Sequence, residues 1–401
     1  MPISKKMAAA AAGASMVRKM FEEGGKMKAQ FGPDNVFDFS IGNPDVPPPP
    51  AFKETLLRLI QEDRPGLHGY MPNAGWPQAR EQVAAFLTRD QGQGLNNPFT
   101  ANHIIMTVGA SGALNIILKA IMDPGDEVVT QRPYFMEYNV YADNFNGKLV
   151  AADPGPDFRL NVEGLQAKIT PATRAVIVNS PHNPTGVIYQ AEELAALGRV
   201  LDEAGKKHGR PIYLLSDEPY RKLAYGGATV PSVFPAYRHS VVCTSYSKDM
   251  SLPGERIGYA AINPDMPDSG ALFDAMTMAN RILGFVSAPS LAQLAVGELQ
   301  GTSVDIGLYE KRRDLFVAGL KKIGYDLTVP GGAFYLFPRS PIEDDTAFVD
   351  LLKEEKILTV PGRGFSMPGY FRICYCVPVK AIENSLPGFA RALEKAKKLA
   401  G

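Results

Sequence analysis

The sequence has little cysteine, no long hydrophobic run and no excess of charge of either sign. Its three cysteines, Cys243, Cys374 and Cys376, are too few for a disulfide framework and predict reduced thiols in a cytoplasmic protein. No apolar run approaches the roughly 20 residues that cross a bilayer, so no membrane partner is expected. The 42 basic residues balance 42 acidic ones, which removes the simplest electrostatic case for binding nucleic acid.

The first residues look superficially like a secretory leader. Lys5 and Lys6 precede an apolar stretch at residues 7–17, as a charged region precedes the apolar centre of a signal peptide. That stretch is mostly alanine and glycine, however, and Arg18-Lys19 follow at once. We expect a poorly ordered leader that runs into a helix, with a secretory signal as the alternative.

Proline and hydrophobic periodicity divide the chain, whose 401 residues are enough for two or three domains. Four consecutive prolines at 47–50 fix an extended connector, where we place a domain boundary. From there to residue 290, short apolar runs alternate with helical stretches, which predicts an α/β domain around a mostly parallel sheet. Residues 291–401 predict a smaller α+β domain. The predicted strands cover residues 37–41, 104–108, 127–130, 175–179, 213–216, 241–245, 257–262, 333–337 and 371–376, and the predicted helices cover 15–30, 111–122, 191–207, 291–300, 309–323 and 382–399.

Polar residues follow four of the predicted strands at the point where each strand ends. In open α/β sheets, ligands bind outside the carboxyl ends of the strands, so these residues are expected to share one rim. Each feature alone has an ordinary structural explanation, such as a turn, a helix cap, a surface charge or tight strand-to-helix packing. The four segments are residues 109–112, 179–186, 216–220 and 243–248.

Four motifs lie within and after these segments, and their order and spacing carry the resemblance given below. They are Asn183-Pro184-Thr185-Gly186, Asp217-Glu218-Pro219-Tyr220, Ser245-Tyr246-Ser247-Lys248 and Gly254-Glu255-Arg256-Ile257-Gly258-Tyr259. With them the chain resembles, over nearly its whole length, the class I and II (fold type I) aminotransferases that depend on pyridoxal 5′-phosphate (PLP), and in particular the aspartate aminotransferases. The resemblance implies an α/β fold with helices on both faces of the sheet. It assigns residues 48–290 to a large PLP-binding domain, and residues 1–47 and 291–401 to a small one.

The resemblance implies three catalytic residues. Lys248 would form a Schiff base with the cofactor aldehyde and then carry protons. Asp217 holds the family position of a buried carboxylate that keeps the pyridine nitrogen protonated. Tyr220 and Asn183 match the two residues that donate hydrogen bonds to the phenolic oxygen of the ring.

The same resemblance implies further cofactor contacts. Arg256 would bind the phosphate through its planar fork and Ser245 through its hydroxyl. The backbone N–H groups of Ala110 and Ser111 would bind it at a helix N-terminus. Phe135 occupies the family position of the aromatic residue that stacks on the ring.

Other residues match family positions that concern the substrate and the second subunit. Arg372 resembles the arginine that grips the substrate α-carboxylate in a bidentate manner, assisted by Asn183 and the backbone of Gly42. Tyr70 matches a tyrosine that reaches the phosphate of the neighbouring subunit. The resemblance therefore implies a homodimer with shared active sites, and closure of the two domains on the substrate.

The expected reaction is ping-pong transamination from an L-amino acid to a 2-oxo acid. Lys248 would move a proton between the substrate Cα and the C4′ carbon of the cofactor. Aspartate, alanine and aromatic donors remain open. An aspartate donor would need a second cation, for which Arg281 is a candidate, although a surface arginine at a helix end is the simpler interpretation.

Other functions match the sequence less well. Ser245-x-x-Lys248 has the form of a hydrolase motif, but its companion motifs Ser-Asp-Asn and Lys-Thr-Gly are absent. No Gly-x-Gly-x-x-Gly follows a first strand, which weakens a dehydrogenase, and the five histidines lack metal-ligand spacing, so no metal is expected. Two alternatives remain: carbon–sulfur lyase or decarboxylase chemistry with the same cofactor and fold, and a non-enzymatic PLP-binding regulator.

Overall fold

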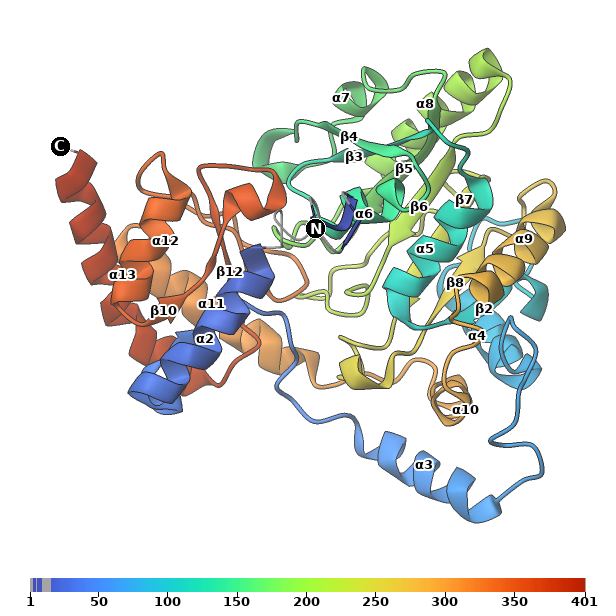
Figure 1. The fold of residues 1–401 in the computed structure, drawn as a ribbon, viewed down its shortest axis with the longest axis horizontal. Helices are drawn as coiled ribbons and strands as arrows, with labels where there is room; N and C mark the ends of the chain where they lie inside the picture. Colours follow the sequence, from blue (N-terminus) through green and yellow to red (C-terminus); the bar gives the residue numbers. More distant parts are fainter. Residues whose placement is uncertain (1–2, 5, 9–15, 401) are drawn as a thin grey trace.

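A seven-stranded sheet forms the centre of the larger part of the molecule (Figure 1). The computed structural model describes residues 3–4, 6–8 and 16–400, so most of the expected leader lies outside the described residues. The strand order is β2-β8-β7-β6-β5-β3-β4, and only β8 runs antiparallel to its neighbours, which confirms the predicted mostly parallel sheet. The strands are β2 (Ile104–Thr107), β3 (Glu127–Gln131), β4 (Lys148–Ala152), β5 (Thr173–Asn179), β6 (Tyr213–Asp217), β7 (Ser240–Ser245) and β8 (Gly258–Ile262).

Helices cover both faces of this sheet, as predicted. Val176 and Val178 of β5 share one hydrophobic cluster with Leu197 of α8, whereas Ile177 belongs to another cluster with Met276 of α9. Because both faces are withdrawn from water, the central strands consist of continuous apolar runs. The helices around the sheet are α3 (Pro50–Glu62), α4 (Pro77–Asp90), η2 (Ala101–His103), α5 (Gly109–Ile121), α6 (Glu137–Asp143), η3 (Pro156–Phe158), α7 (Val162–Gln166), α8 (Ala191–His208), η4 (Pro253–Glu255), α9 (Ser269–Ile282) and α10 (Ser290–Glu298).

Strand β4 was not predicted because it lies at the edge of the sheet. It pairs only with β3, and only its last residue, Ala152, is fully buried. A half-exposed strand of five residues produces neither a continuous apolar run nor a strict alternation that stands out in the sequence. The predicted bounds of the other six strands of this sheet agree with the observed ones within two residues.

A second hydrophobic core holds the smaller α+β part together, on the left of Figure 1. The Phe39 ring lies 5.1 Å from the Phe316 ring of α11 and 6.1 Å from the Phe389 ring of α13, measured between centroids. Strand β1, just before Phe39, pairs in parallel with β10. The elements of this part are α2 (Met16–Phe31), η1 (Pro33–Asn35), β1 (Phe37–Asp38), α11 (Ile306–Ile323), β9 (Tyr335–Leu336), α12 (Asp345–Glu354), β10 (Ile357–Leu358), β11 (Val360–Pro361), η5 (Gly362–Phe365), β12 (Phe371–Cys374) and α13 (Val379–Ala400).

The segment before the prolines is fastened to this second core. The two terminal nitrogens of the Arg312 guanidinium in α11 donate hydrogen bonds to the two carboxylate oxygens of Asp45, at 2.7 and 2.9 Å. Such a bidentate pair fixes orientation as well as position. Pro50 then opens α3, because a proline without an N–H fits the first position of a helix.

Helix α10 lies with the larger part of the molecule, although the predicted boundary at residue 290 would place it in the smaller domain. It packs against α3 and α4, and Val296 belongs to the cluster that covers one face of the large sheet. Residues 292–297 of this helix are all buried. A helix that is apolar on most of its sides needs such a core around it, and the sequence alone does not show which core this is.

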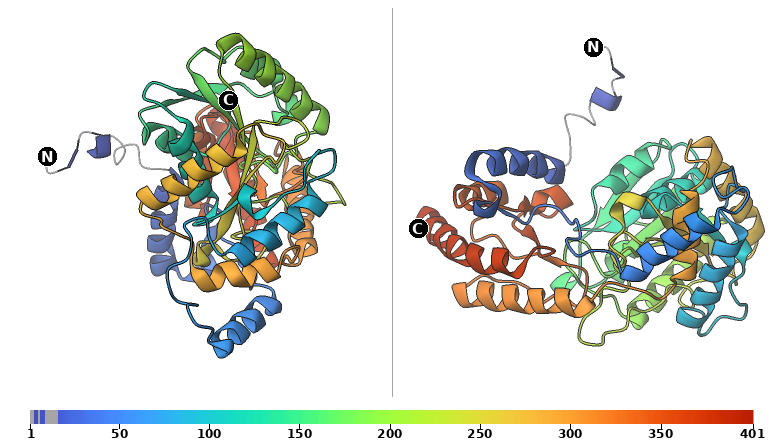
Figure 2. Two further views of the ribbon diagram at one scale, coloured as in Figure 1. Left: turned by 90° about the vertical axis from the view of Figure 1, so that its right-hand side faces the viewer. Right: turned by 90° about the horizontal axis from the view of Figure 1, so that it is seen from below.

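The longest described helix, α13, has 22 residues and runs beside α11 in the smaller part (Figure 2). Its buried face includes Phe389, Ala392 and Ala396, while lysines and glutamates occupy the other side. This pattern is typical of an amphipathic helix on a core. Among the described residues, no helix has both the length and the apolar content of a membrane-spanning segment.

Candidate functional site

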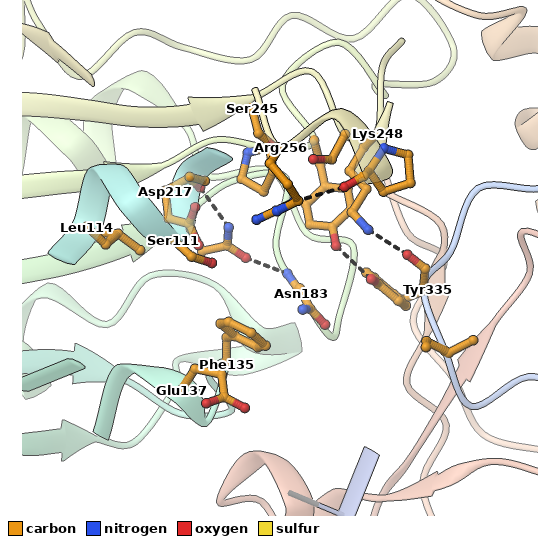
Figure 3. Close-up of a pocket in the computed structure, with 18 of the residues that line it drawn as sticks. Ser111, Leu114, Phe135, Glu137, Asn183, Asp217, Ser245, Lys248, Arg256 and Tyr335 are labelled. Atoms are coloured by element: carbon orange, nitrogen blue, oxygen red, sulfur yellow. Dashed lines mark hydrogen bonds between the residues drawn. The ribbon is translucent and has the colours of Figure 1, made fainter. Parts of the chain in front are cut away.

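A cavity of about 460 Å³ opens at the carboxyl ends of the central strands, between the sheet and the smaller part (Figure 3). Its wall brings together residues that are far apart in the sequence, from the segment before α3 to strand β12. The predicted site residues that line it are Gly42, Ala110, Ser111, Phe135, Asn183, Asp217, Tyr220, Ser245, Lys248, Arg256 and Arg372.

The sheet delivers several of these side chains to one rim because its parallel strands end there. Asn179, Asp217 and Ser245 are the last residues of the adjacent strands β5, β6 and β7. Ser111 lies in the first turn of α5, directly after β2. This is the edge at which open α/β sheets bind ligands.

Asp217 is buried, with 6 % of its surface exposed, and only partly satisfied by hydrogen bonds. The Tyr138 hydroxyl donates to its Oδ2 at 2.5 Å, and the Asn179 amide donates to its backbone oxygen at 2.7 Å. Its Oδ1 is buried without a hydrogen-bond partner in the described part of the chain. Burial raises the pKa of Asp217 to about 7, Tyr138 lowers it, and the neighbouring carboxylate of Glu218 adds to the rise.

Arg372 is a buried cation, 3 % exposed, that pairs with no carboxylate among the described residues. Its Nη1 donates to the Asn183 side-chain oxygen at 3.1 Å, and its Nη2 donates to the Ser40 backbone oxygen at 2.6 Å. Its Nε is buried without a partner. The guanidinium also lies 4.6 Å from the centroid of the Tyr335 ring. A buried arginine held by neutral oxygens is suited to receive an anion.

Lys248 lies three residues beyond β7 and extends toward the smaller part. Its Nζ donates a hydrogen bond of 2.5 Å to the backbone oxygen of Gly42 and lies 5.6 Å from the centroid of the Phe334 ring. Burial lowers the pKa of Lys248 below its usual range. Gly42 leaves room for Tyr335 beside this contact, because a Cβ at residue 42 would collide with the Tyr335 hydroxyl.

Arg256 and the start of α5 form a second cationic region. Arg256 donates to the backbone oxygens of Pro253 and Val108 at 3.0 and 3.2 Å, and no acidic side chain of the described chain pairs with it. No side chain caps the first turn of α5, and Ala110 and Ser111 of that turn line the cavity. Arginine beside a helix N-terminus is a typical phosphate-binding arrangement.

The sequence did not indicate three residues that shape the cavity. Tyr335 lines the cavity, and its hydroxyl shares a 2.6 Å hydrogen bond with the Tyr220 hydroxyl. In the sequence it is one of several apolar and aromatic residues of the predicted strand at 333–337. Tyr138 supports Asp217 from behind the wall, and Glu137 lines the cavity beside Phe135. The latter two follow Phe135 within three residues, so the neighbourhood of a predicted site residue was the only signal for them.

Two predicted residues do not line the cavity of their own chain. Tyr70 is 96 % exposed, and Arg281 is exposed on α9. Neither side chain is therefore buried by contacts within its own chain. Of the residues that the structure describes, no three His, Cys, Asp or Glu side chains gather as metal ligands would.

The chain is similar to a large group of known enzymes. The model of the family described as aminotransferase class I and II matches residues 34–386. The aspartate/prephenate aminotransferase of Thermus thermophilus is 32 % identical over 378 residues, covering 89 % of this chain and 91 % of the relative. The aspartate aminotransferase of Bacillus subtilis is 33 % identical over 382 residues, or 90 % and 92 % of the two chains. A crystal structure of an amino transferase from Eubacterium rectale has a TM-score of 0.94 and 39 % identity, and covers 98 % of this chain and 99 % of that one.

The raised pKa of Asp217 predicts how the stability of the ligand-free protein depends on pH. A carboxyl group whose pKa rises on folding, from 3.8 to about 7, binds its proton more tightly in the folded state. Through this group the free energy of unfolding should therefore fall by about 1.4 kcal/mol per pH unit near pH 5, and by about half as much per unit at pH 7. Urea unfolding of wild type and Asp217→Asn at several pH values measures this, because the variant lacks the slope. Parallel pH profiles for the two proteins would contradict the pKa assignment.

Proposed function

The chain belongs to the class I and II aminotransferases, and from that premise we propose which of its residues hold the cofactor, grip the substrate and move the proton. It is a PLP-dependent transaminase of fold type I, so the family, fold, enzyme class and cofactor predicted from the sequence are confirmed. The lyase, decarboxylase and regulator alternatives are not favoured, because the relatives that match most of the chain are named aminotransferases.

The observation that carries the assignment of residues is the unpartnered Oδ1 of Asp217 in the cavity wall. A pyridinium N–H would satisfy this oxygen and hold the carboxylate ionised, although burial alone favours its protonated form. When bound, PLP withdraws electrons from the substrate Cα and so makes the Cα proton acidic. The residues present therefore fit the cofactor.

Other cavity residues fit the remaining parts of PLP. Asn183 already accepts from Arg372 through its oxygen, which leaves its amide N–H₂ to donate to the phenolic oxygen, together with the Tyr220 hydroxyl. Arg256 and Ser245, with the first-turn amides of α5, would hold the phosphate. Phe135 offers a flat apolar face at the cavity wall for the ring.

Arg372 would bind the α-carboxylate of the substrate. A cation buried among neutral oxygens, with its Nε left without a partner, gains most from a carboxylate that accepts two hydrogen bonds at once. Ser40 and Asn183 fix the plane of the guanidinium, so the carboxylate would approach from a defined direction. The substrate would then lie between the smaller part, which supplies Arg372, and the sheet.

Lys248 would attach the cofactor covalently and then act as the proton carrier. Its depressed pKa increases the fraction of neutral amine, which can accept the proton from Cα. The Gly42 carbonyl holds Nζ inside the cavity rather than in solvent. The amino acid would leave as an oxo acid, and its amino group would stay with the cofactor between the two half-reactions. A 2-oxo acid would then receive this amino group while Lys248 returns the proton to its Cα.

We further propose that the two parts of the chain move relative to each other when substrate binds. Arg372 and Gly42 come from the smaller part, whereas Lys248 and Asp217 come from the sheet, so a substrate that contacts both would draw them together. The small domain would comprise residues 1–47 and the chain after α10. This division follows the predicted one except that α10 joins the large domain, because it packs there.

A homodimer in the cytoplasm is the proposed form of the enzyme. Tyr70 is almost fully exposed although it matches a residue of a shared site, and it would enter the partner's cavity. The exposed apolar side chains of Leu57 and Ile60 on α3, at the periphery in Figures 1 and 2, and of Met278 on α9 would be covered in the dimer. The three cysteines are free and buried, which agrees with a reducing compartment.

Replacement of Lys248 by alanine should abolish turnover, because no other amine of the described chain lines the cavity to carry the proton. We expect kcat to fall at least roughly 10²–10⁴-fold for every amino donor that the wild type uses. Oxo-acid formation, followed with a panel of L-amino acids and 2-oxo acids, measures this. Lys311→Ala, at an exposed site on α11, is the matched control and should keep wild-type rates. A Lys248→Ala rate equal to that of the control would end the assignment.

Mixing two impaired variants tests the shared active site. In a dimer of Tyr70→Ala and Lys248→Ala subunits, one cavity combines both intact residues and the other has lost both. Random reassociation should therefore restore roughly a quarter of the wild-type activity, since half of the dimers are mixed. Refolding of the two variants together and apart, followed by the transaminase assay, measures the gain. A mixture that is no more active than the average of its two components would contradict the shared site.

A further inference from the structure

One acidic side chain lines the cavity without a role in the proposed reaction. Glu137 is the first residue of α6 and half-buried at the cavity wall. Its carboxylate makes no ion pair and accepts no hydrogen bond from the other described residues. It therefore presents an unneutralised negative charge to whatever enters the cavity.

Each basic residue in the cavity wall already has a role in the proposed reaction. These residues are Arg256, Lys248 and Arg372, which the proposed function uses for the phosphate, the proton and the α-carboxylate. Among the residues that the structure describes, no further cation lies in the wall of this chain's cavity for a second carboxylate on the substrate. Arg281, the candidate for that role from the sequence, does not line the cavity of its own chain.

Glu137 lies in the cavity wall across from Lys248, and its neighbours leave its charge uncancelled. In the view of Figure 3, Glu137 and Phe135 lie on the opposite side of the cavity from Lys248 and Tyr335. Tyr141 is one helical turn beyond Glu137, and burial raises its pKa to about 12, with the Glu137 charge as a further cause. At neutral pH Tyr141 therefore remains a neutral phenol, which does not cancel the charge of Glu137.

We propose that Glu137 selects amino acids whose side chain ends in an N–H donor, either an ammonium or guanidinium group or an amide, and rejects those that end in a carboxylate. This inference rests on the proposed function, because it takes the α-carboxylate to be bound by Arg372. Like charges repel across a cavity from which water is partly excluded, whereas an N–H donor would satisfy the free carboxylate. The chain would thus differ in donor preference from relatives named aspartate aminotransferases.

Two carboxylates of similar length but opposite distal charge test the inference by binding alone. Glutarate carries a second carboxylate, and 5-aminopentanoate carries an ammonium group at the corresponding end. Titration of each into the PLP-loaded enzyme, followed by calorimetry, gives the two dissociation constants. We expect the wild type to bind 5-aminopentanoate at least about tenfold more tightly than glutarate. Glu137→Gln should reduce this ratio by about tenfold, and Glu137→Lys should invert it.

The matched control is Glu383→Gln, which removes an exposed carboxylate from α13 and should leave the wild-type ratio unchanged. In the transaminase assay, kcat/KM for L-lysine relative to L-glutamate should shift in the same direction as the binding ratio. Equal ratios in wild type and Glu137→Gln would overturn the selection by Glu137 and leave the grip of Arg372 in place. If neither ligand bound any of the proteins, the proposed binding of a carboxylate by Arg372 would be wrong, and the selection by Glu137 would fall with it.

Discussion

The site depends on a carboxylate that the fold buries and leaves half satisfied. Asp217 ends a central strand whose two faces are covered by helices, so its charge has almost no access to water. Burial of an ionised carboxylate without a full set of partners costs several kcal/mol. Tyr138 offsets part of that cost through one oxygen, while the other oxygen stays free at the cavity wall. This arrangement gives the cavity an affinity for a cationic N–H that a solvated carboxylate would not have.

Two arginines of the cavity provide separate positive charges that complement the carboxylate of Asp217. Arg372 and Arg256 are each held by neutral backbone or amide oxygens rather than by acidic side chains. A ligand with two separate anionic groups and a protonated ring nitrogen would satisfy all three sites at once, and PLP together with an amino-acid substrate has these groups. Since Arg372 comes from the smaller part of the molecule, binding of such a ligand would also couple the two parts. Recognition and closure would then share one physical cause.

The sequence predicted most of this framework because the relevant signals are local. Buried parallel strands leave apolar runs, and the polar motif after each run identifies the rim where the runs end, as at Asp217 and Lys248. What the sequence could not predict depends on packing between distant segments. The edge strand β4 has no distinctive pattern, and the packing of α10 against α3 and α4 is not visible in its own sequence. Tyr335 reaches the site only because the smaller part folds against the sheet. The sequence likewise could not show that one carboxylate oxygen of Asp217 has no partner, or that the Glu137 carboxylate is unpaired. Both facts depend on how distant segments pack around the cavity.

The protonation state of the bound cofactor tests the central claim most directly. The ¹⁵N chemical shift of the ring nitrogen in enzyme loaded with ¹⁵N-labelled PLP distinguishes a pyridinium from a neutral pyridine. If the free oxygen of Asp217 holds this nitrogen, the wild type should show the protonated shift at neutral pH and above, and Asp217→Ala should show the unprotonated one. A neutral pyridine shift in the wild type, or a protonated shift that persists in Asp217→Ala, would contradict the account.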